Sequence, residues 1–275
     1  MSGTNSVVAI RDLGKTFGNE GSQTVALSGI NLTIQPGEFV SLIGPSGCGK
    51  STLLRIIGDL TGPTTGTVEV NGKPAARART DRDYGMVFQA PVLFDWRTIE
   101  ANVALPLEII DMPRARRAQR TAEMLSLVEL SDFARHHPWQ LSGGMQQRAA
   151  IARALAFEPR LLLMDEPFGA LDEMTRERMN TELLRIWEQT GTTIVFVTHS
   201  IPEAVFLSSR VVVMSARPGR ITKVIEVGLP RPRSDETREL EPYFELITEV
   251  RESLKAGGHG SDAGTIADKP LEALQ

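Results

Sequence analysis

The chain is 275 residues long, with 41% hydrophobic and 23% charged residues, which is the composition of an ordinary globular protein. Its 30 basic and 34 acidic residues give a formal net charge of −4, so composition gives no reason to expect binding to nucleic acid. Cys48 is the single cysteine, which excludes an internal disulfide and a cysteine-based metal site. The sequence shows neither an apolar run of about 18 residues nor a signal-like start, so we expect any membrane role to come through a partner.

The first third of the chain is predicted to be rich in strands. Residues 1–6 are polar and are expected to form a disordered tail. Residues 53–57, which follow a glycine-rich stretch, are expected to form the first turns of a helix. Apolar or alternating runs predict strands at 7–10, 24–27, 30–34, 38–43 and 67–70.

Helices dominate the next part of the chain, from residue 98 to about 156. Helical spacing of apolar residues predicts helices at 100–110 and 114–129. Two short apolar runs then predict buried parallel strands, with an amphipathic helix between them. These strands are expected at 160–164 and 192–198, and the helix at 174–189.

The last predicted strands, 210–214 and 220–224, form an antiparallel pair around Pro218-Gly219. Beyond them the signals weaken. Pro230 and the charged residues after it predict a linker, and apolar spacing predicts one helix at 242–254. The closing stretch from residue 256 contains glycines and is expected to be mobile.

The stretch Gly44–Thr52 follows a predicted buried strand and precedes a predicted helix, which is the context of a phosphate-binding P-loop. Its glycines let backbone amides form a concave anion site, toward which the next helix directs its positive end. Lys50 is placed to reach the β- and γ-phosphates of a nucleotide, and Ser51 to bind Mg²⁺. A chance glycine loop is the alternative, which the full spacing disfavours. The residues expected to contact the nucleotide here are Gly44, Pro45, Ser46, Gly47, Cys48, Gly49, Lys50, Ser51 and Thr52.

Two acidic residues, Asp165 and Glu166, directly follow the predicted strand at 160–164. The carboxyl ends of parallel strands form the ligand-binding edge of an α/β sheet, so both carboxylates are expected beside the P-loop. Asp165 is placed to hold Mg²⁺, directly or through water. Glu166 is placed to act as a general base or to orient the attacking water. An acidic turn after a core strand explains either residue alone, but less well once the P-loop is present.

A third motif, Leu141–Arg148, places a serine and two glycines at the start of a predicted helix. Ser142, Gly143 and Gly144 offer a small hydroxyl, accessible backbone amides and a helix N-terminus, which together suit a second anion site. An N-cap followed by flexible glycines explains the same residues. The residues alone leave both interpretations open.

Together these motifs resemble, in order, the set found in ATP-binding-cassette (ABC) ATPases, of which Leu141–Arg148 resembles the signature motif. Gly44–Thr52 resembles the Walker A loop, and Leu161–Glu166 the Walker B strand with its catalytic glutamate. Further residues match the remaining motifs of the family: Phe17 the A-loop residue that stacks on adenine, Gln89 the Q-loop, Gly169–Asp172 the D-loop and His199 the switch histidine.

The resemblance implies an α/β fold: a P-loop NTPase core with an antiparallel β subdomain and an inserted helical subdomain at about 92–157. The ABC ATPase domain is expected to span 7–229. Residues 230–275 form a C-terminal extension, partly helical and then mobile, whose role the sequence does not indicate. The resemblance also implies ATP and Mg²⁺ as cofactors. The implied catalytic residues are Glu166, His199 and Gln89, and the implied metal ligands are Ser51, Gln89 and Asp165.

The mechanism implied by the resemblance needs two copies of the chain. They would face each other head to tail, so that Ser142–Gly144 of one copy close over ATP on the P-loop of the other. The stretch Phe94–Val103 resembles the segment after the Q-loop in the ATPase subunits of importers for nitrate, taurine and aliphatic sulfonates. Those relatives usually have proline where this chain has Asp95. The implied function is the energy-coupling ATPase subunit of a small-solute importer. The alternative is a cassette of an exporter or a cytosolic regulator that does not serve transport.

The implied partners follow from that function. They are a second copy of the chain, multi-span membrane permease subunits and, indirectly, a periplasmic or extracellular solute-binding protein. Nucleic acid is not among them. The implied location is the cytoplasmic face of the inner or cell membrane, where permease subunits would hold the chain peripherally.

Overall fold

The computed structural model describes residues 6–18 and 22–258. Residues 1–5 of the tail expected at 1–6, and residues 259–275 of the closing stretch, lie outside the described residues. No helix in the described ranges is long and apolar enough to cross a membrane.

The strands are β1 (Val8–Phe17), β2 (Thr24–Ile34), β3 (Phe39–Ile43), β4 (Thr65–Val70), β5 (Lys73–Pro74), β6 (Tyr84–Val87), β7 (Leu161–Asp165), β8 (Thr193–Val197), β9 (Arg210–Met214) and β10 (Ile221–Glu226). The helices are α1 (Lys50–Ile57), α2 (Ala75–Thr80), α3 (Ile99–Ile109), α4 (Arg114–Leu127), α5 (Gly143–Leu155), α6 (Glu173–Thr190), α7 (Ile201–Leu207) and α8 (Glu241–Gly258). Three short 3-10 turns lie at Ser131–Phe133, Pro138–Gln140 and Asp235–Glu239.

The core of the fold is a six-stranded sheet in the order β10-β9-β3-β8-β7-β6. Strands β6, β7, β8, β3 and β9 run parallel, and β10 closes the edge antiparallel to β9. The pairs β3–β8 and β7–β8 place the ends of three strands side by side, each entirely buried. The loops after β3, β7 and β8 therefore meet at one edge of the sheet, as the sequence predicted.

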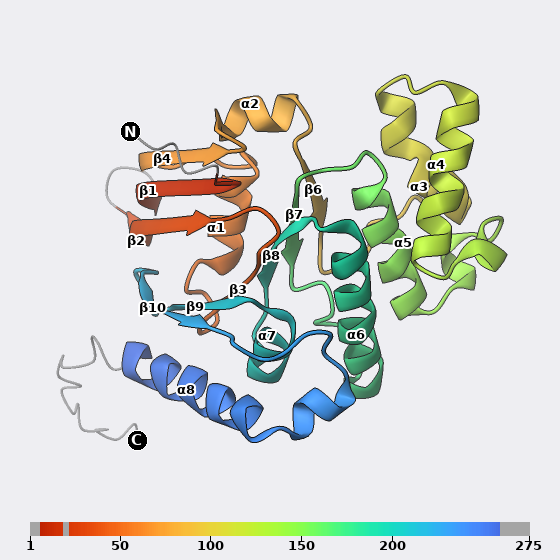
Figure 1. Cartoon of the computed structure of the whole chain (residues 1–275). Coiled ribbons are helices and arrows are strands. Elements are labelled where there is room, and N and C mark those ends of the chain that lie inside the picture. The colour runs from red at the N-terminus through yellow and green to blue at the C-terminus, as the bar shows by residue number, and fades with distance from the viewer. Residues whose placement is uncertain (1–5, 19–21, 259–275) are drawn as a thin grey trace, which may run out of the picture.

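Alternate residues of this sheet face two separate hydrophobic clusters. Leu162 of β7 packs in one cluster with Ile151 of α5, and its neighbour Leu163 packs in the other with Leu53 of α1. Because successive side chains of a strand point to opposite faces, α1 and α5 lie on opposite faces of the sheet. Figure 1 shows α1 beside the antiparallel sheet and α5 beside the yellow-green helices α3 and α4.

A second, antiparallel sheet has the order β2-β1-β4-β5 and packs over α1. Its strands are longer than the sequence indicated. β1 continues to Phe17, and β2 is one strand from Thr24 to Ile34 rather than the predicted strands at 24–27 and 30–34. Register shifts in the β1–β2 pair let the chain pass Gly29, which has a φ of 61°, without ending the strand.

The helices α3, α4 and α5 form a group at the side of the core, within the range 92–157 expected for the helical subdomain. Thr98 caps α3 by accepting a hydrogen bond from the Ala101 amide. Asn102 is fully buried, donates to the carbonyls of Phe94, Arg97 and Thr98, and accepts from the Phe94 amide. One side chain therefore fixes the loop that leads into α3.

The C-terminal extension departs from the sequence prediction in two respects. The stretch predicted as a linker after Pro230 instead packs on the core, and Arg233 is only 5% exposed. The predicted helix at 242–254 is confirmed as α8, but it continues through residues 256–258, which the sequence assigned to a mobile end. Contacts with α7, β9 and β10 hold α8 against the sheet.

Candidate nucleotide-binding site

The P-loop runs from β3 into α1, and its glycines are required by close backbone approaches. Gly49 has a φ of 97°, and a Cβ built there would lie 2.6 Å from a methyl group of Leu27. Gly47 has a φ of 74°. These conformations are strained for any residue with a side chain. The amides of the loop and the first turn of α1 are thereby available to an anion.

Lys50 and Cys48 are both buried in this loop. The Lys50 ammonium donates to the carbonyls of Gly44 at 2.9 Å and Pro45 at 3.2 Å. These two hydrogen bonds hold its positive charge within the loop. Burial raises the pKa of the Cys48 thiol, an effect that nearby Lys50 opposes. The thiol is therefore protonated at neutral pH and acts as a small packing residue.

Ser51 and Asp165 meet at the carboxyl edge of the sheet. The Ser51 hydroxyl donates to the Asp165 carboxylate at 2.6 Å, although 114 residues separate them in the chain. A hydroxyl and a carboxylate oxygen beside a phosphate site form a donor set that suits Mg²⁺. No cluster of three or more His, Cys, Asp or Glu side chains that could hold a metal occurs among the described residues. Ser51 and Asp165 would supply part of the coordination of such an ion, and a bound nucleotide and water would supply the rest.

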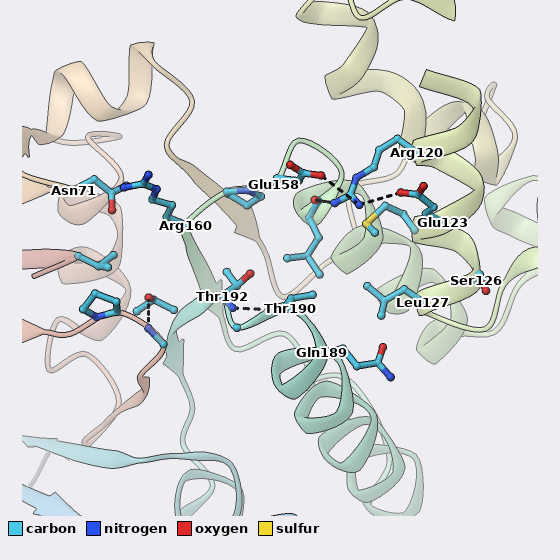
Figure 2. A pocket seen from close by; sticks show the side chains of 18 of the residues that line it. Asn71, Arg120, Glu123, Ser126, Leu127, Glu158, Arg160, Gln189, Thr190 and Thr192 are labelled. Carbon is cyan, nitrogen blue, oxygen red and sulfur yellow. Dashed lines mark hydrogen bonds and ion pairs between the residues drawn. The ribbon is translucent and has the colours of Figure 1, made fainter. Parts of the chain in front are cut away.

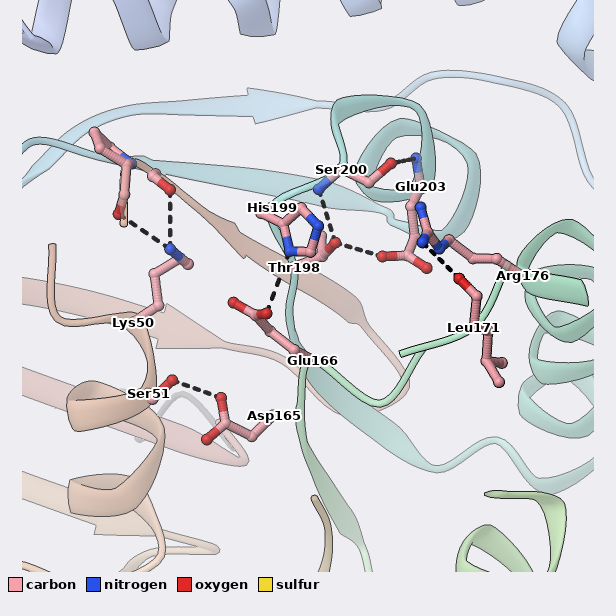
Figure 3. Close-up of polar contacts among 12 residues, drawn as sticks. Lys50, Ser51, Asp165, Glu166, Leu171, Arg176, Thr198, His199, Ser200 and Glu203 are labelled. Carbon is pink, nitrogen blue, oxygen red and sulfur yellow. Dashed lines mark hydrogen bonds and ion pairs between the residues drawn. The ribbon is translucent and has the colours of Figure 1, made fainter. Parts of the chain in front are cut away.

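Glu166 and His199 lie at the ends of the neighbouring strands β7 and β8. The Nδ1 atom of His199 is 3.2 Å from the Glu166 carboxylate (Figure 3). Glu166 has a φ of 47°, a strained conformation for a non-glycine residue, and is held by hydrogen bonds to Val197 and from Gly169. This backbone directs a carboxylate and an imidazole to one place, where they can orient a water molecule and accept its proton.

Phe17 lies at the end of β1, where its ring is 45% exposed. The Lys15 ammonium lies 4.9 Å from the centre of that ring. An exposed aromatic face at the end of a strand offers a platform on which a base can stack.

Gln89 is exposed just beyond β6, and its side-chain amide nitrogen would lie 3.2 Å from a Cβ built on Gly169. The carbonyl of its neighbour Phe88 accepts a hydrogen bond at 3.1 Å from Gln147 of α5. The Q-loop is therefore tied to the helix that carries the signature residues.

Ser142 caps α5 by accepting a hydrogen bond from the Met145 amide at 3.3 Å. Ser142 and Gly143 are exposed, whereas Gly144 is buried against Thr175. The structure thus gathers the P-loop, Asp165, Glu166 and His199 around one edge of the sheet, and places the signature helix on the opposite face from α1.

The sequence analysis assigned no role to Arg217, which lies beside the P-loop. Its guanidinium would be 3.4 Å from a Cβ built on Gly47. The pairing of β9 with β3 and the hydrogen bonds between Gly219 and β2 bring these residues together. No local pattern around Arg217 indicates that pairing, so sequence reasoning had no signal for this contact.

A cavity of about 1050 Å³ lies at the other edge of the sheet, where β7 and β8 begin (Figure 2). Its lining includes Arg160 and Thr193 at the starts of these strands, and Arg120 and Glu123 of α4. Arg120 is already engaged by Glu123 and by the carbonyls of Leu155 and Ala156. This cavity is separate from the P-loop edge and contains none of the predicted site residues.

Comparison with known proteins identifies the family of this chain. A family model described as ABC transporter matches residues 27–169, more than half of the chain. The chain belongs to the ABC transporter family. An ABC transporter ATP-binding protein of Methanocaldococcus jannaschii, itself uncharacterised, is 46% identical over 90% of this chain and 93% of its own length. The aliphatic sulfonates import ATP-binding protein SsuB of Bacillus cereus is 43% identical over 91% of this chain and 97% of its own length.

Solved structures agree with the family assignment. A dimeric ATP-binding cassette in a post-hydrolysis state, bound to ADP and Pi, matches with a TM-score of 0.69 and 38% identity, covering 80% of this chain and 98% of that one. The cassette cbiO1 of Clostridium perfringens, part of a transporter complex, matches with a TM-score of 0.74 and 27% identity, covering 93% of this chain and 98% of that one. The fold is therefore that of an ABC ATPase, and the chain is an ATP-binding, ATP-hydrolysing subunit of this family.

Proposed function

We propose that this chain is the energy-coupling ATPase subunit of an importer for a small solute of the aliphatic sulfonate, nitrate or taurine class. The observation that carries this proposal is the 43% identity to an aliphatic sulfonates import subunit over nearly the whole of both chains. The match extends beyond the nucleotide-binding motifs into the helical region, where partners of the ATPase dock in the proposed assembly.

The ATPase acts as a head-to-tail dimer in this proposal. Because α1 and α5 lie on opposite faces of the sheet, the exposed Ser142 and Gly143 are positioned for a nucleotide other than the one on their own P-loop. A second copy brings the two half-sites together. The dimeric state of a cassette 38% identical to this chain supports the arrangement.

The surface proposed for the membrane permease is formed by the segment between the Q-loop and α3 and by the 3-10 turn Pro138–Gln140. It exposes Phe94, Trp96 and Trp139, the last two by 75% and 65%. Trp139 stacks on His137, whose Nδ1 contacts the Asp95 carbonyl at 3.2 Å. Large exposed aromatic side chains on a fixed loop are typical of a protein interface. Docking here would hold the ATPase at the cytoplasmic face of the membrane, with a solute-binding protein on the other side.

Each site residue has a proposed role in hydrolysis. Ser51, Asp165 and Gln89 would hold Mg²⁺, which would neutralise charge on the β- and γ-phosphates. Glu166 orients the attacking water and accepts its proton, and His199 donates a hydrogen bond to the γ-phosphate. Phe17 stacks on adenine. Ser142, Gly143 and Gly144 of the second copy bind the γ-phosphate from the opposite side.

Growth of a deletion strain tests the transport function. The strain is supplied with one sulfur source at a time: sulfate, taurine or a short aliphatic sulfonate, with nitrate tested separately as the nitrogen source. We expect normal growth on sulfate and loss of growth on one of the class members. The intact gene should restore growth, and a Lys50→Ala gene should not, because Lys50 binds the phosphates. Undiminished growth of the deletion strain on every class member would overturn the proposed import function.

A further inference from the structure

Beside His199 lies a buried polar cluster that the hydrolysis site does not use. Thr198 is 2% exposed and Glu203 is 5% exposed, and they flank the turn from β8 to α7 that carries His199. The Thr198 hydroxyl donates to the Glu203 carboxylate and accepts from the Ser200 amide at 3.0 Å. The Ser200 hydroxyl accepts from the Glu203 amide at 3.4 Å. Three hydrogen bonds therefore close this turn (Figure 3).

The same carboxylate faces Arg176 of α6. Burial raises the pKa of Glu203, while the hydrogen bond from Thr198 and the positive charge of Arg176 oppose that rise. The Arg176 guanidinium also donates to the Leu171 carbonyl at 2.8 Å. Leu171 in turn lies beside the signature motif, 3.6 Å from a Cβ built on Gly143. Arg176 is thus bonded to the D-loop, residues 169–172, and its charge acts on the buried carboxylate without a hydrogen bond between the two side chains.

The His199 ring itself has little packing to hold it, because its side chain is 59% exposed. Its position against Glu166 therefore depends on the backbone that carries it. That backbone is fixed by the buried hydrogen bonds of Thr198, directly before His199, and of Ser200, directly after it. A buried polar network whose members are mutually bonded gives a backbone a single arrangement.

We propose that Glu203 is a positioning residue for hydrolysis. Through its hydrogen bond with Thr198 it fixes the turn that sets His199 against Glu166. The inference rests on the roles given to Glu166 and His199 under the proposed function.

Two substitutions of Thr198 test the connection in the full chain. Thr198→Val keeps the shape but removes the hydroxyl, whereas Thr198→Ser keeps the hydroxyl. We expect Thr198→Val to lower kcat for ATP hydrolysis about ten- to hundredfold, the loss typical of a misplaced catalytic group, with the KM for ATP changed less than about twofold. Thr198→Ser should recover kcat to within about threefold of the parent. Equal losses in the two variants, or an unchanged kcat in Thr198→Val, would overturn the proposal.

Glu203→Gln tests the contribution of the negative charge on the Glu203 carboxylate. Glutamine can still accept the hydrogen bond from Thr198 but presents no charge to Arg176, so we expect a loss of kcat smaller than that of Thr198→Val. Ser208→Ala is the matched control, because Ser208 is equally buried at the other end of α7 and donates to Ser41 rather than toward His199. It should keep the parent kcat. A loss of kcat in Ser208→Ala as large as in Thr198→Val would show a general effect of core damage and contradict the proposal.

A double-mutant cycle with His199→Ala distinguishes failure of this inference from failure of the His199 role. If Thr198 acts through His199, Thr198→Val should lower the residual kcat of His199→Ala by less than about twofold. Full additivity of the two losses would overturn the positioning role of the cluster. A parent-like kcat in His199→Ala together with a reduced kcat in Thr198→Val would reject the catalytic role of His199, and with it the route proposed for Glu203.

Discussion

At the scale of single residues, the site is set by backbone conformations that side chains ordinarily avoid. Glu166 has a φ of 47°, and Gly49 and Gly47 have φ values of 97° and 74°. For Glu166 the strain is held in place by the Val197 carbonyl and the Gly169 amide. Such a conformation persists only where its surroundings determine it, and here it brings the carboxylate to 3.2 Å from the His199 ring.

Glu166→Gln tests the assignment of the base. The substitution preserves size and the hydrogen bond with His199 but leaves a side chain that cannot accept a proton. We expect ATP binding at the parent affinity and a loss of turnover of about a hundredfold or more, as for removal of a general base. Turnover of radiolabelled ATP and equilibrium binding of a fluorescent nucleotide measure the two effects. Parent-like turnover would remove Glu166 from this role.

At the scale of elements, α7 is held at both ends by the C-terminal extension. Arg233 donates to the carbonyls of Val205, Phe206 and Ser208, at the end of α7 where backbone acceptors lack helical partners. The Tyr243 hydroxyl donates to the Pro202 carbonyl at the other end, at 3.1 Å. The extension is therefore part of the folded core around the helix that follows His199.

Arg233→Met tests whether the hydrogen bonds of Arg233 to the end of α7 stabilise the fold. Burial, helped by the nearby charge of Arg231, lowers the pKa of Arg233 to about 9, so the guanidinium stays charged at neutral pH and its charge is costly to bury. Methionine removes that cost but leaves several buried carbonyls unpartnered, and the second effect is the larger. We expect a loss of unfolding free energy of roughly 2–4 kcal/mol in urea denaturation. Arg251→Met, at an exposed position of α8, is the control. An unchanged urea midpoint for Arg233→Met would contradict a stabilising role for these hydrogen bonds.

Local patterns predicted the elements that carry the site, and long-range packing decided the rest. The strands before Gly44 and Asp165, and the helix after Asp172, followed from apolar periodicity and turn residues. The two strands predicted at 24–27 and 30–34 are the single strand β2, because pairing with β1 carries the chain across Gly29. The burial of Arg233 left no local signal, because the carbonyls of Val205, Phe206 and Ser208 that it bonds lie 25 to 28 residues away in the chain.

At the scale of the whole molecule, the topology places the two segments predicted to bind nucleotide on opposite faces of one sheet. The phosphate loop leads into α1 on one face, and Ser142 begins α5 on the other. Residues that must contact the same γ-phosphate therefore come from different copies in the proposed mechanism. The Q-loop and D-loop lie between them, since Gln147 of α5 bonds the Phe88 carbonyl and Leu171 lies beside Gly143.

Ser142→Arg tests this division in a Glu166→Gln background, where hydrolysis cannot reopen a closed dimer. Arginine at the exposed N-terminus of α5 is too large to let a second P-loop approach, but it lies on the opposite face of the sheet from α1 in its own chain. We therefore expect parent-like ATP binding to the monomer and no ATP-dependent dimer in size-exclusion chromatography with light scattering. Ser142→Ala is the matched control, because it also loses the N-cap to Met145 but adds no bulk, and it should still form the dimer. A Ser142→Arg protein that dimerises normally with ATP would show that the signature residues do not face a partner's nucleotide.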